Sequence, residues 1–396
     1  MNYILFDHSP VRENLLPLTF TRPVCEIRTG ILTIKEKWQK HFEGDFSYLT
    51  KEYLSDKYPL VKNSLNILIN GAVMPDKQLT EVIKNLTTNQ VLIQDKQIIA
   101  FCSKQIPDLD QLDQFIGKSD QINYTQDIFK IENLWDIFRC NDKAIEADFE
   151  LLTAGRKSFE LSNTNNIIAK EKIFIEEGAK AEFATINAST GPVYLGKNTE
   201  IMEGSVIRGP FAMCNNSLVK MSAKIYGPTT LGPHVKVGGE INNAVFTGYS
   251  NKAHDGFLGN AVIGEWCNLG ADTNNSNLKN NYAHVKLWNY HAERFVNTGL
   301  QMCGLIMGDH SKCGINTMFN TGTVVGVNAN IFGSGFPRNF IPSFSWGGAH
   351  GFTAFSINKA FEVAEKMMSR RNIDFNDIEK NILIKVFEMT DKYRKF

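Results

Sequence analysis

Residues 229–248 read TTLGPHVKVGGEINNAVFTG, a stretch in which an aliphatic residue returns about every six positions and is often followed by glycine. Leu231-Gly232 and Val237-Gly238 are two steps of this period, and Ile241 is the next aliphatic step. A period this short indicates a solenoid, because one coil cannot bury its own apolar side and must stack on the next. Six residues fit one side of a triangular coil, with glycine and asparagine supplying the unusual backbone angles at the corners.

The same period continues on both sides of this stretch, from Ile173 to Val325-Gly326. Further steps are Leu195-Gly196, Ile201, Ile207, Ile225, Phe246-Thr247-Gly248, Leu258-Gly259, Ile263-Gly264, Leu269-Gly270 and Met307-Gly308. An ordinary β-sandwich is the alternative, but it usually spaces its strands 8–12 residues apart. We therefore predict a solenoid over residues 166–345. Asp272–Asn281 is expected to leave the stack as a loop, and Phe340–Phe352 to end it.

The residues before the solenoid have a different character. In 1–165, strand-like runs such as Tyr3–Phe6 and Leu65–Asn70 alternate with helical stretches such as Ile31–Phe42. Val91–Ile93 and Gln97–Cys102 are expected to pair around a turn. This alternation predicts an α/β domain.

The residues after the solenoid, 346–396, are expected to be helical. Ile357–Arg371 and Asp377–Arg394 both carry apolar residues at helical spacing, and Asn376 with Glu379 suggests an N-terminal cap. These helices would cover the open end of the solenoid, where exposed strand edges promote aggregation.

Composition excludes several classes of protein. Lys+Arg and Asp+Glu both number 42, so no net charge draws the chain to nucleic acid or to an anionic membrane. No apolar run approaches the ~20 residues that span a bilayer, and the segment after Met1 reaches Asp7 too soon for a signal peptide. The seven cysteines are scattered and form no CxxC pair, so we expect reduced thiols, no metal site and a cytoplasmic location.

His254 is the candidate catalytic residue. It lies in the segment SNKAHDGFLG (250–259), followed by CNLGAD (267–272) and Ser276-Asn277, and preceded by VGGE (237–240). An imidazole titrates near neutral pH and can take a proton from an amine that attacks an acyl group. A carboxylate such as Glu240 would hold the tautomer and stabilise the imidazolium.

These motifs resemble the acetyltransferase half of the GlmU family, whose members acetylate glucosamine-1-phosphate and uridylylate the product. The resemblance implies a left-handed parallel β-helix of hexapeptide repeats, a homotrimer with sites between neighbouring solenoids, and acetyl-CoA as co-substrate. It assigns Glu240 to the side of His254, Asn268 and Asn277 to the amino sugar, and the Ala271 backbone amide to the oxyanion, where one donor contributes about 3 kcal/mol.

The chain departs from the family where the sugar phosphate is bound. Asn242 and Phe257 stand where the family has a lysine and a tyrosine, and each lost charge-assisted contact would cost roughly 1.5–3 kcal/mol. Lys224 lies near the position of a family arginine, and Lys279 or Lys286 is a further candidate for the phosphate. We therefore expect the base to be kept and the phosphate contacts to be rebuilt, with an acceptor that need not be glucosamine-1-phosphate.

The first domain resembles a sugar nucleotidyltransferase more loosely. RENLLPLTFTRP (12–23) is similar to the nucleotide-binding motif of that class, and ENLWDIF (132–138) to the hinge before its solenoid. Departures are Asp7-His8-Ser9-Pro10 in place of a glycine-rich turn, Asn14 and Val24 in place of basic residues, and Ala72 in place of an Mg²⁺-binding aspartate. The candidate nucleotide contacts are Arg12, Arg22, Arg28 and Gly71, with Mg²⁺ required only if this domain is active.

Three functions remain open at this point. The leading one is an acetyl-CoA-dependent N-acetyltransferase acting on an amino-sugar phosphate or a nucleotide-linked amino sugar, with or without nucleotidyl transfer by the first domain. The second is a sugar-1-phosphate nucleotidyltransferase whose solenoid is regulatory or oligomerising. The third is a trimeric scaffold that binds a sugar nucleotide without turnover. The spacing of Glu240 and His254 favours the first.

Overall fold

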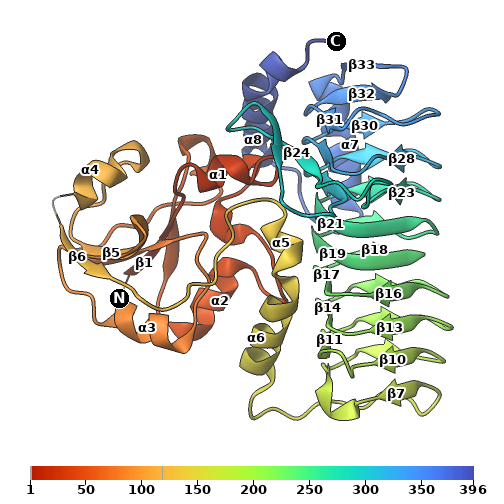
Figure 1. Ribbon diagram of the computed structural model, residues 1–396, viewed down its shortest axis with the longest axis horizontal. Helices are drawn as coiled ribbons and strands as arrows, with labels where there is room; N and C mark the ends of the chain where they lie inside the picture. The colour runs from red at the N-terminus through yellow and green to blue at the C-terminus, as the bar shows by residue number, and fades with distance from the viewer. Residues whose placement is uncertain (1, 118) are drawn as a thin grey trace. The chain divides into compact units, whose positions relative to one another are not determined.

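The computed structural model describes residues 2–117 and 119–396 and divides them into two compact units (Figure 1). The first unit comprises residues up to Leu15, Thr21–Ile27 and Leu32–Asn133. The second comprises Leu16–Phe20, Arg28–Ile31 and Leu134–Phe396, which includes the whole solenoid. This division differs from the expected ranges, because 134–165 belong with the solenoid rather than with the α/β domain.

The first unit is built on a mixed sheet in the order β2-β1-β3-β5-β4-β6. Strands β1, β2 and β3 run parallel, whereas β5 is antiparallel to both β3 and β4. Its strands are β1 Asn2–Phe6, β2 Phe46–Leu49, β3 Asn66–Asn70, β4 Gln90–Gln94, β5 Gln97–Ser103 and β6 Asp120–Asn123; its α-helices are α1 Val11–Asn14, α2 Ile34–His41, α3 Lys77–Lys84 and α4 Leu112–Ile116. The predicted α/β domain is confirmed.

Local sequence signals account for these elements. The helix expected from Ile31 begins at Ile34, because Thr33 caps it in a capping box with Glu36. The turn between β4 and β5 is formed by Asp95 and Lys96, whose φ values of 48° and 68° suit a tight hairpin.

The second unit is a parallel β-solenoid with three faces, as the repeat predicted (Figure 1). We call them faces A, B and C in chain order. Strands β19 and β21 are long enough to turn the corner from A to B. The strands of face A are β7 Asn166–Ile168, β10 Thr185–Asn187, β13 Val206–Arg208, β16 Lys224–Tyr226, the first parts of β19 Glu240–Gly248 and β21 Phe257–Glu265, then β23 Asn274–Asn275 and β28 Met318–Phe319.

The strands of face B are β8 Ile173–Ile175, β11 Val193–Leu195, β14 Phe211–Met213, β17 Thr229–Leu231, the last parts of β19 and β21, then β26 Leu305–Met307, β29 Thr323–Val325 and β31 Phe340–Ile341.

Face C is a 10-stranded sheet. Its strands are β9 Lys180–Ala181, β12 Glu200–Ile201, β15 Leu218–Val219, β18 Lys236–Val237, β20 Asn251–Lys252, β22 Asn268–Leu269, β27 Lys312–Cys313, β30 Asn330–Ile331, β32 Ser345–Gly348 and β33 Gly351–Ala354. All of its pairs are parallel except the final β32–β33 hairpin.

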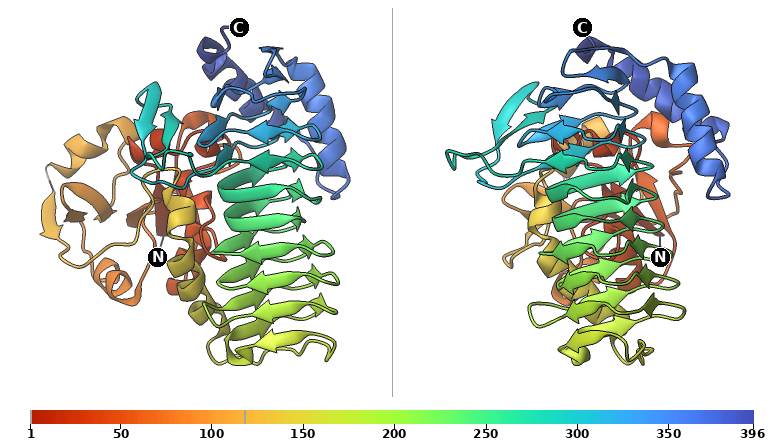
Figure 2. Two further views of the ribbon diagram at one scale, coloured as in Figure 1. Left: turned by 45° about the vertical axis from the view of Figure 1, so that its right-hand side comes forward. Right: turned by 90° about the vertical axis from the view of Figure 1, so that its right-hand side faces the viewer.

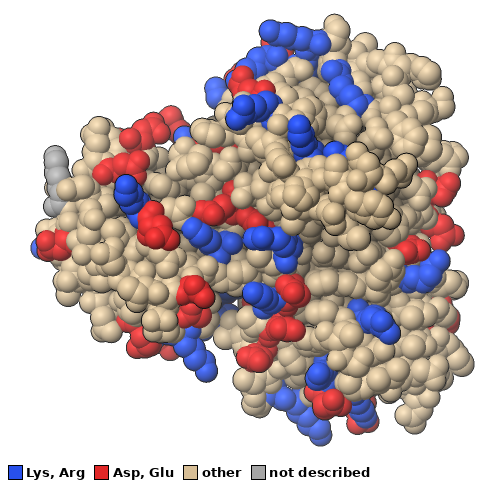
Figure 3. Space-filling model, viewed as in Figure 1, with Lys and Arg blue, Asp and Glu red and all other residues tan. Residues whose placement is uncertain are grey.

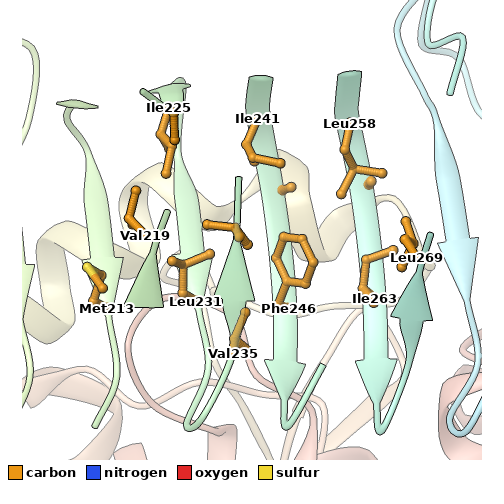
Figure 4. Close-up of a cluster of buried hydrophobic side chains, with 14 of the residues drawn as sticks. Met213, Val219, Ile225, Leu231, Val235, Ile241, Phe246, Leu258, Ile263 and Leu269 are labelled. Carbon is orange, nitrogen blue, oxygen red and sulfur yellow. The ribbon is translucent and has the colours of Figure 1, made fainter. Parts of the chain in front are cut away.

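The aliphatic anchors of the repeat form the core of this unit. Ile225, Ile241 and Leu258 are register partners on face A. Figure 4 shows these side chains, together with Leu231, Phe246 and others, pointing into the space between the faces. Each is at most 2% exposed, so the stacking of coils buries the apolar side that a single coil would leave exposed.

One of the two expected interruptions begins later than predicted, and the other is confirmed. Asp272–Asn281 was expected to leave the stack, but Asn274–Asn275 form β23 and pair in parallel with β28. The excursion begins after β23 and returns at β26, and it contains an antiparallel hairpin of β24 Lys286–Asn289 and β25 Arg294–Asn297. At the other end, the stack finishes at Phe340–Phe352 as expected: β31 and β32 still pair in parallel with the coil below, and the antiparallel β32–β33 hairpin ends the sheet of face C.

Helices flank the solenoid within its own unit (Figure 2). α5 Asp136–Arg139 and α6 Asn141–Thr153 precede it, and α7 Ile357–Ser369 and α8 Asp377–Met389 follow it. Asn376 caps α8 by accepting a hydrogen bond from the Glu379 amide, as its position predicted. Phe387 of α8 meets Phe344 edge to face at 5.0 Å, which packs the helix on the last coil.

Candidate functional site

His254 lies at the corner where each coil passes from face C to face A. It follows β20 and precedes β21, and it stands at the wall of an open groove of about 690 Å³. Residues of five successive coils line this groove: Met202, Lys220, Met221, Gly238, Gly239, Ala253, His254, Asp255, Ala271 and Asp272. The groove therefore runs across the stack, and the structure brings His254 and Ala271 together in it.

Both groups are available to a ligand. The His254 side chain is exposed and makes no hydrogen bond to any residue that the structure describes. The Ala271 carbonyl accepts from the Asn316 amide at 2.8 Å, whereas the Ala271 N–H donates to none of the described residues. A fixed peptide with a free N–H is the kind of donor that stabilises an oxyanion.

The floor of the groove requires glycine. A Cβ on Gly238 would stand 2.7 Å from the Ala253 carbonyl oxygen, and a Cβ on Gly239 would stand 2.8 Å from the Asp255 Cα. Gly239 also has a φ of +74°, in the left-handed region. Consecutive coils can therefore approach closely at this corner only because these two positions are glycine.

A buried lysine lies directly behind His254. Lys252 is the register partner of Val237 and is fully buried, at a position that holds an aliphatic residue in the coils below. Its ammonium donates to the carbonyl oxygens of His254 at 2.7 Å and Asp255 at 2.9 Å. Burial lowers its pKa to about 8. Lys252 was not among the predicted site residues. A lysine at a position of the repeat that points into the core could have identified it.

Glu240 does not pair with His254. Its carboxylate accepts a hydrogen bond from the Tyr226 hydroxyl at 2.6 Å, and this bond raises the pKa of Tyr226 to about 12. The register partner of Glu240 in the coil above is Phe257, three residues beyond His254. In the coil below it is Lys224. Lys224, Glu240 and Phe257 therefore form a column on face A, beside the corner that carries His254.

Asn277 joins the upper end of this column. Its amide donates to the Asn260 side-chain oxygen at 2.8 Å. A Cβ on Gly259 would meet both the Phe257 ring at 2.5 Å and the Asn277 amide at 2.8 Å. The absence of a side chain at Gly259 thus lets Phe257 and Asn277 lie side by side.

The other predicted sugar and phosphate residues lie apart from this column. Asn268 is on face C and lines a different pocket, described below. Lys279 and Lys286 are on the excursion, where Lys279 donates to the His284 carbonyl at 3.2 Å and Lys286 is exposed on β24. None of the three lines the groove at His254.

The predicted nucleotide contacts of the first unit are engaged in its core. Arg12 is buried, and it bonds the Asp7 carboxylate at 3.1 Å and the Tyr53 hydroxyl at 2.9 Å. Asp7 also accepts from Thr50 and from the Val24 amide, and burial raises its pKa. Arg12 therefore serves the fold rather than an open phosphate site.

The remaining candidates of that set are also enclosed. Arg22 is buried with only 5% of its surface exposed. Arg28 belongs to the second unit, where its guanidinium donates to the carbonyls of Thr247 and Ile31. Gly71 follows β3 and packs against Phe6 and Cys25. A Cβ at position 71 would lie 3.2 Å from the Phe6 carbonyl oxygen and 3.3 Å from the Cys25 Cβ.

The residues around the end of β3 do not fit an Mg²⁺ ion. Ala72, where the resemblance led us to look for an aspartate, offers no side-chain oxygen, and the Asp7 carboxylate is occupied by the contacts above. Within residues 2–117 and 119–396, no three His, Cys, Asp or Glu side chains cluster as metal ligands. Among the same residues, no helix has the length and apolarity to cross a membrane. On the face shown in Figure 3, basic and acidic side chains are interspersed.

Comparison with known proteins gives matches to both units. A family model for sugar nucleotidyl transferases matches residues 3–157. An uncharacterized acetyltransferase, YaiX of Escherichia coli, is 30% identical over 176 residues, which are 44% of this chain and 74% of YaiX. The bifunctional protein GlmU of Methanococcus aeolicus is 25% identical over 306 residues, 69% of this chain and 72% of that protein.

A solved structure also matches the chain. A UDP-N-acetylglucosamine acyltransferase of Francisella novicida superposes with a TM-score of 0.34 and 14% identity, over 58% of this chain and 84% of that one.

Proposed function

This chain belongs to the GlmU-like family of sugar nucleotidyltransferase–acetyltransferases, and on that premise we propose that its solenoid unit is an acetyl-CoA-dependent N-acetyltransferase for a phosphorylated or nucleotide-linked amino sugar. The chain is a transferase, as its relatives are. One observation carries the finer proposal. The corner groove holds an imidazole and a backbone N–H that are both without partners among the described residues.

The chemistry assigned to these groups is acyl transfer. His254 takes a proton from the amine of the acceptor while the amine nitrogen bonds to the thioester carbonyl carbon. The Ala271 N–H donates to the oxyanion of the tetrahedral intermediate. The carbon–sulfur bond then breaks, the carbonyl reforms, and the thiol of coenzyme A leaves with a proton. Glu240, Phe257, Asn277 and Lys224 would contact the acceptor from face A.

The direct test is acetyl transfer by the purified full-length chain. Incubation with acetyl-CoA and glucosamine-1-phosphate, or a UDP-linked amino sugar, should release free thiol. His254→Ala should lower kcat by 10²–10⁴-fold, the range typical of a general base. His350→Ala is the matched control, because His350 is also exposed at a turn of the solenoid but lies outside the groove. Equal rates for His254→Ala and His350→Ala would remove His254 from the mechanism.

A second activity, sugar-1-phosphate nucleotidyl transfer, is favoured by the family match over residues 3–157. Since Arg12 and Asp7 are engaged with each other and the donor set does not fit Mg²⁺, we assign no residue of the first unit to this chemistry. Pyrophosphate release from UTP or dTTP with a sugar-1-phosphate, in the absence of acetyl-CoA, would establish it.

A further inference from the structure

A second hollow lies on face C, separate from the groove at His254. It has a volume of about 410 Å³ and shares no lining residue with that groove. Strands of face C and the end of α7 both contribute to its lining, and Figure 2 shows α7 running alongside the solenoid. Its lining residues are Lys236, Tyr249, Asn251, Trp266, Asn268, Lys312, Met367, Arg370 and Arg371. Asn268 was predicted to contact the amino sugar, but this role does not account for the cations and aromatic residues that surround it here.

Four of these residues are cations, and the lining contains no carboxylate. Lys236, Lys312, Arg370 and Arg371 form no salt bridge with any acidic residue that the structure describes. The Lys312 ammonium donates to the His310 carbonyl at 2.7 Å, which fixes its position. Like charges held together without a counter-charge repel each other, so the hollow has a positive potential that an anion would neutralise.

The pKa values of two nearby basic groups, Lys236 and His234, are lowered in part by the surrounding positive charges. Burial, Arg371, Lys220 and Arg370 all lower the pKa of Lys236. Burial, Arg371 and Lys236 lower the pKa of His234 at the adjoining corner. Glu265 acts on Tyr249 from the same corner but is not part of the lining.

The aromatic wall of the hollow also suits an anion. His234, Tyr249 and Trp266 stack face to face up the corner, with ring centroids 5.0 Å and 4.3 Å apart, and His310 continues the stack. Because their faces cover one another, the rings turn edges outward, and ring edges carry the positive end of the aromatic quadrupole.

The spacing of the cations indicates the size of the anion. Lys236, Asn251, Asn268 and Lys312 are successive register partners on face C. Three strand spacings separate the Cα atoms of the two lysines, which is about 14 Å at ~4.8 Å per strand. The long lysine side chains have to bridge part of this span, and two linked phosphates offer oxygens to more of the four cations, including the arginines at the end of α7, than a single phosphate does.

We propose that the hollow formed by face C and the end of α7 is a binding site for the diphosphate group of a small-molecule ligand. Lys236 and Lys312 contact the two ends of the anion from the solenoid, and Arg370 and Arg371 close on it from the helix. Binding at this site does not depend on acetyl transfer at His254, so the two proposals fail or succeed separately.

Isothermal titration of the full-length chain tests the site. The probes are inorganic pyrophosphate, inorganic phosphate, UDP-N-acetylglucosamine and coenzyme A, which separate a free diphosphate from nucleotide-borne ones. We expect pyrophosphate to bind more tightly than phosphate, with affinity that falls as salt rises. At least one of the two organic diphosphates should compete with it.

The double variant Arg370→Gln/Arg371→Gln should weaken pyrophosphate binding at least tenfold. Lys359→Gln/Lys366→Gln is the control, because it removes the same charge from exposed positions of α7 outside the hollow. Melting curves of both variants verify folding. Equal affinity in the two variants, no pyrophosphate binding at millimolar concentration, or phosphate binding as tight as pyrophosphate would each overturn the proposal.

Discussion

At the scale of single residues, Lys252 makes the strongest demand on the fold. A fully buried ammonium group that is bound only to neutral oxygens lowers the stability of the folded state. In return, its hydrogen bonds hold the peptide groups of His254 and Asp255 in place. Since burial lowers its pKa to about 8 from 10.5, the folded state binds fewer protons than the unfolded state between these values. Stability contributed by this group therefore rises as pH increases from about 8 toward 10.5.

Lys252→Met, which keeps the length and removes the charge, should abolish that contribution. Urea unfolding at pH 7, 8 and 9 measures it as the difference between wild type and variant. We expect the variant to be relatively more stable at pH 7 than at pH 9. Buried thiols such as Cys267, whose pKa burial raises to about 12, act in both proteins and cancel in the difference. A difference that does not vary with pH would contradict the buried charge.

Tyr226 and Glu240 give a second prediction at this scale. The hydrogen bond to the Glu240 carboxylate holds the phenol protonated and is the first cause of the raised pKa of Tyr226. Glu240→Gln should bring this pKa down from about 12 toward 10, its ordinary value. Ultraviolet titration of the wild type and of Glu240→Gln, each compared with its Tyr226→Phe derivative, isolates the signal. An unchanged midpoint would mean that the bond does not form in solution.

At the scale of elements, α8 packs on the last coil of the solenoid through Phe387 and Phe344. Its buried residues are Ile382, Leu383 and Val386, and Arg394 stacks over Phe387 at 4.1 Å. A solenoid transmits packing mainly between neighbouring coils. Leu383→Ala should therefore cost about 2–5 kcal/mol locally and speed amide exchange in β31 and β32, but not in β10 and β13. Ile384→Ala, on the exposed side of the same helix, should leave exchange unchanged; uniform acceleration along the whole stack would contradict local coupling.

At the scale of the whole molecule, an exposed apolar row runs along the corner that carries His254. Phe183, Met221 and Ile315 are 66%, 65% and 70% exposed there. Apolar rows of this kind mark interfaces. Together with the family resemblance, the row leads us to expect a homotrimer with the His254 groove between neighbouring solenoids. Light scattering should give three times the chain mass of 44.6 kDa. Ile315→Glu should shift the mass toward one chain, whereas Ile384→Glu on α8 should not.

Much of the solenoid was predictable because its signal is local and repeated. Each coil repeats the anchors of the previous one, so Ile225, Ile241 and Leu258 identify one face without any knowledge of distant contacts. The excursion was placed too early because asparagines at 274 and 275 look like a loop. In the structure their side chains bond the backbone of the coil below at Phe257 and Gly259, a contact that only stacking provides.

By itself, the sequence determined the α/β unit, the three-sided solenoid and its helical end, because periodicity and turn residues act over a few positions. Only the tertiary structure decided the partners. Coil lengths differ, so Glu240 comes level with Phe257 rather than with His254 and bonds Tyr226 instead. Likewise, Lys252 reaches the His254 carbonyl, and Lys236 and Lys312 converge with α7, because stacking and helix packing join residues whose separation in the chain carries no regular signal.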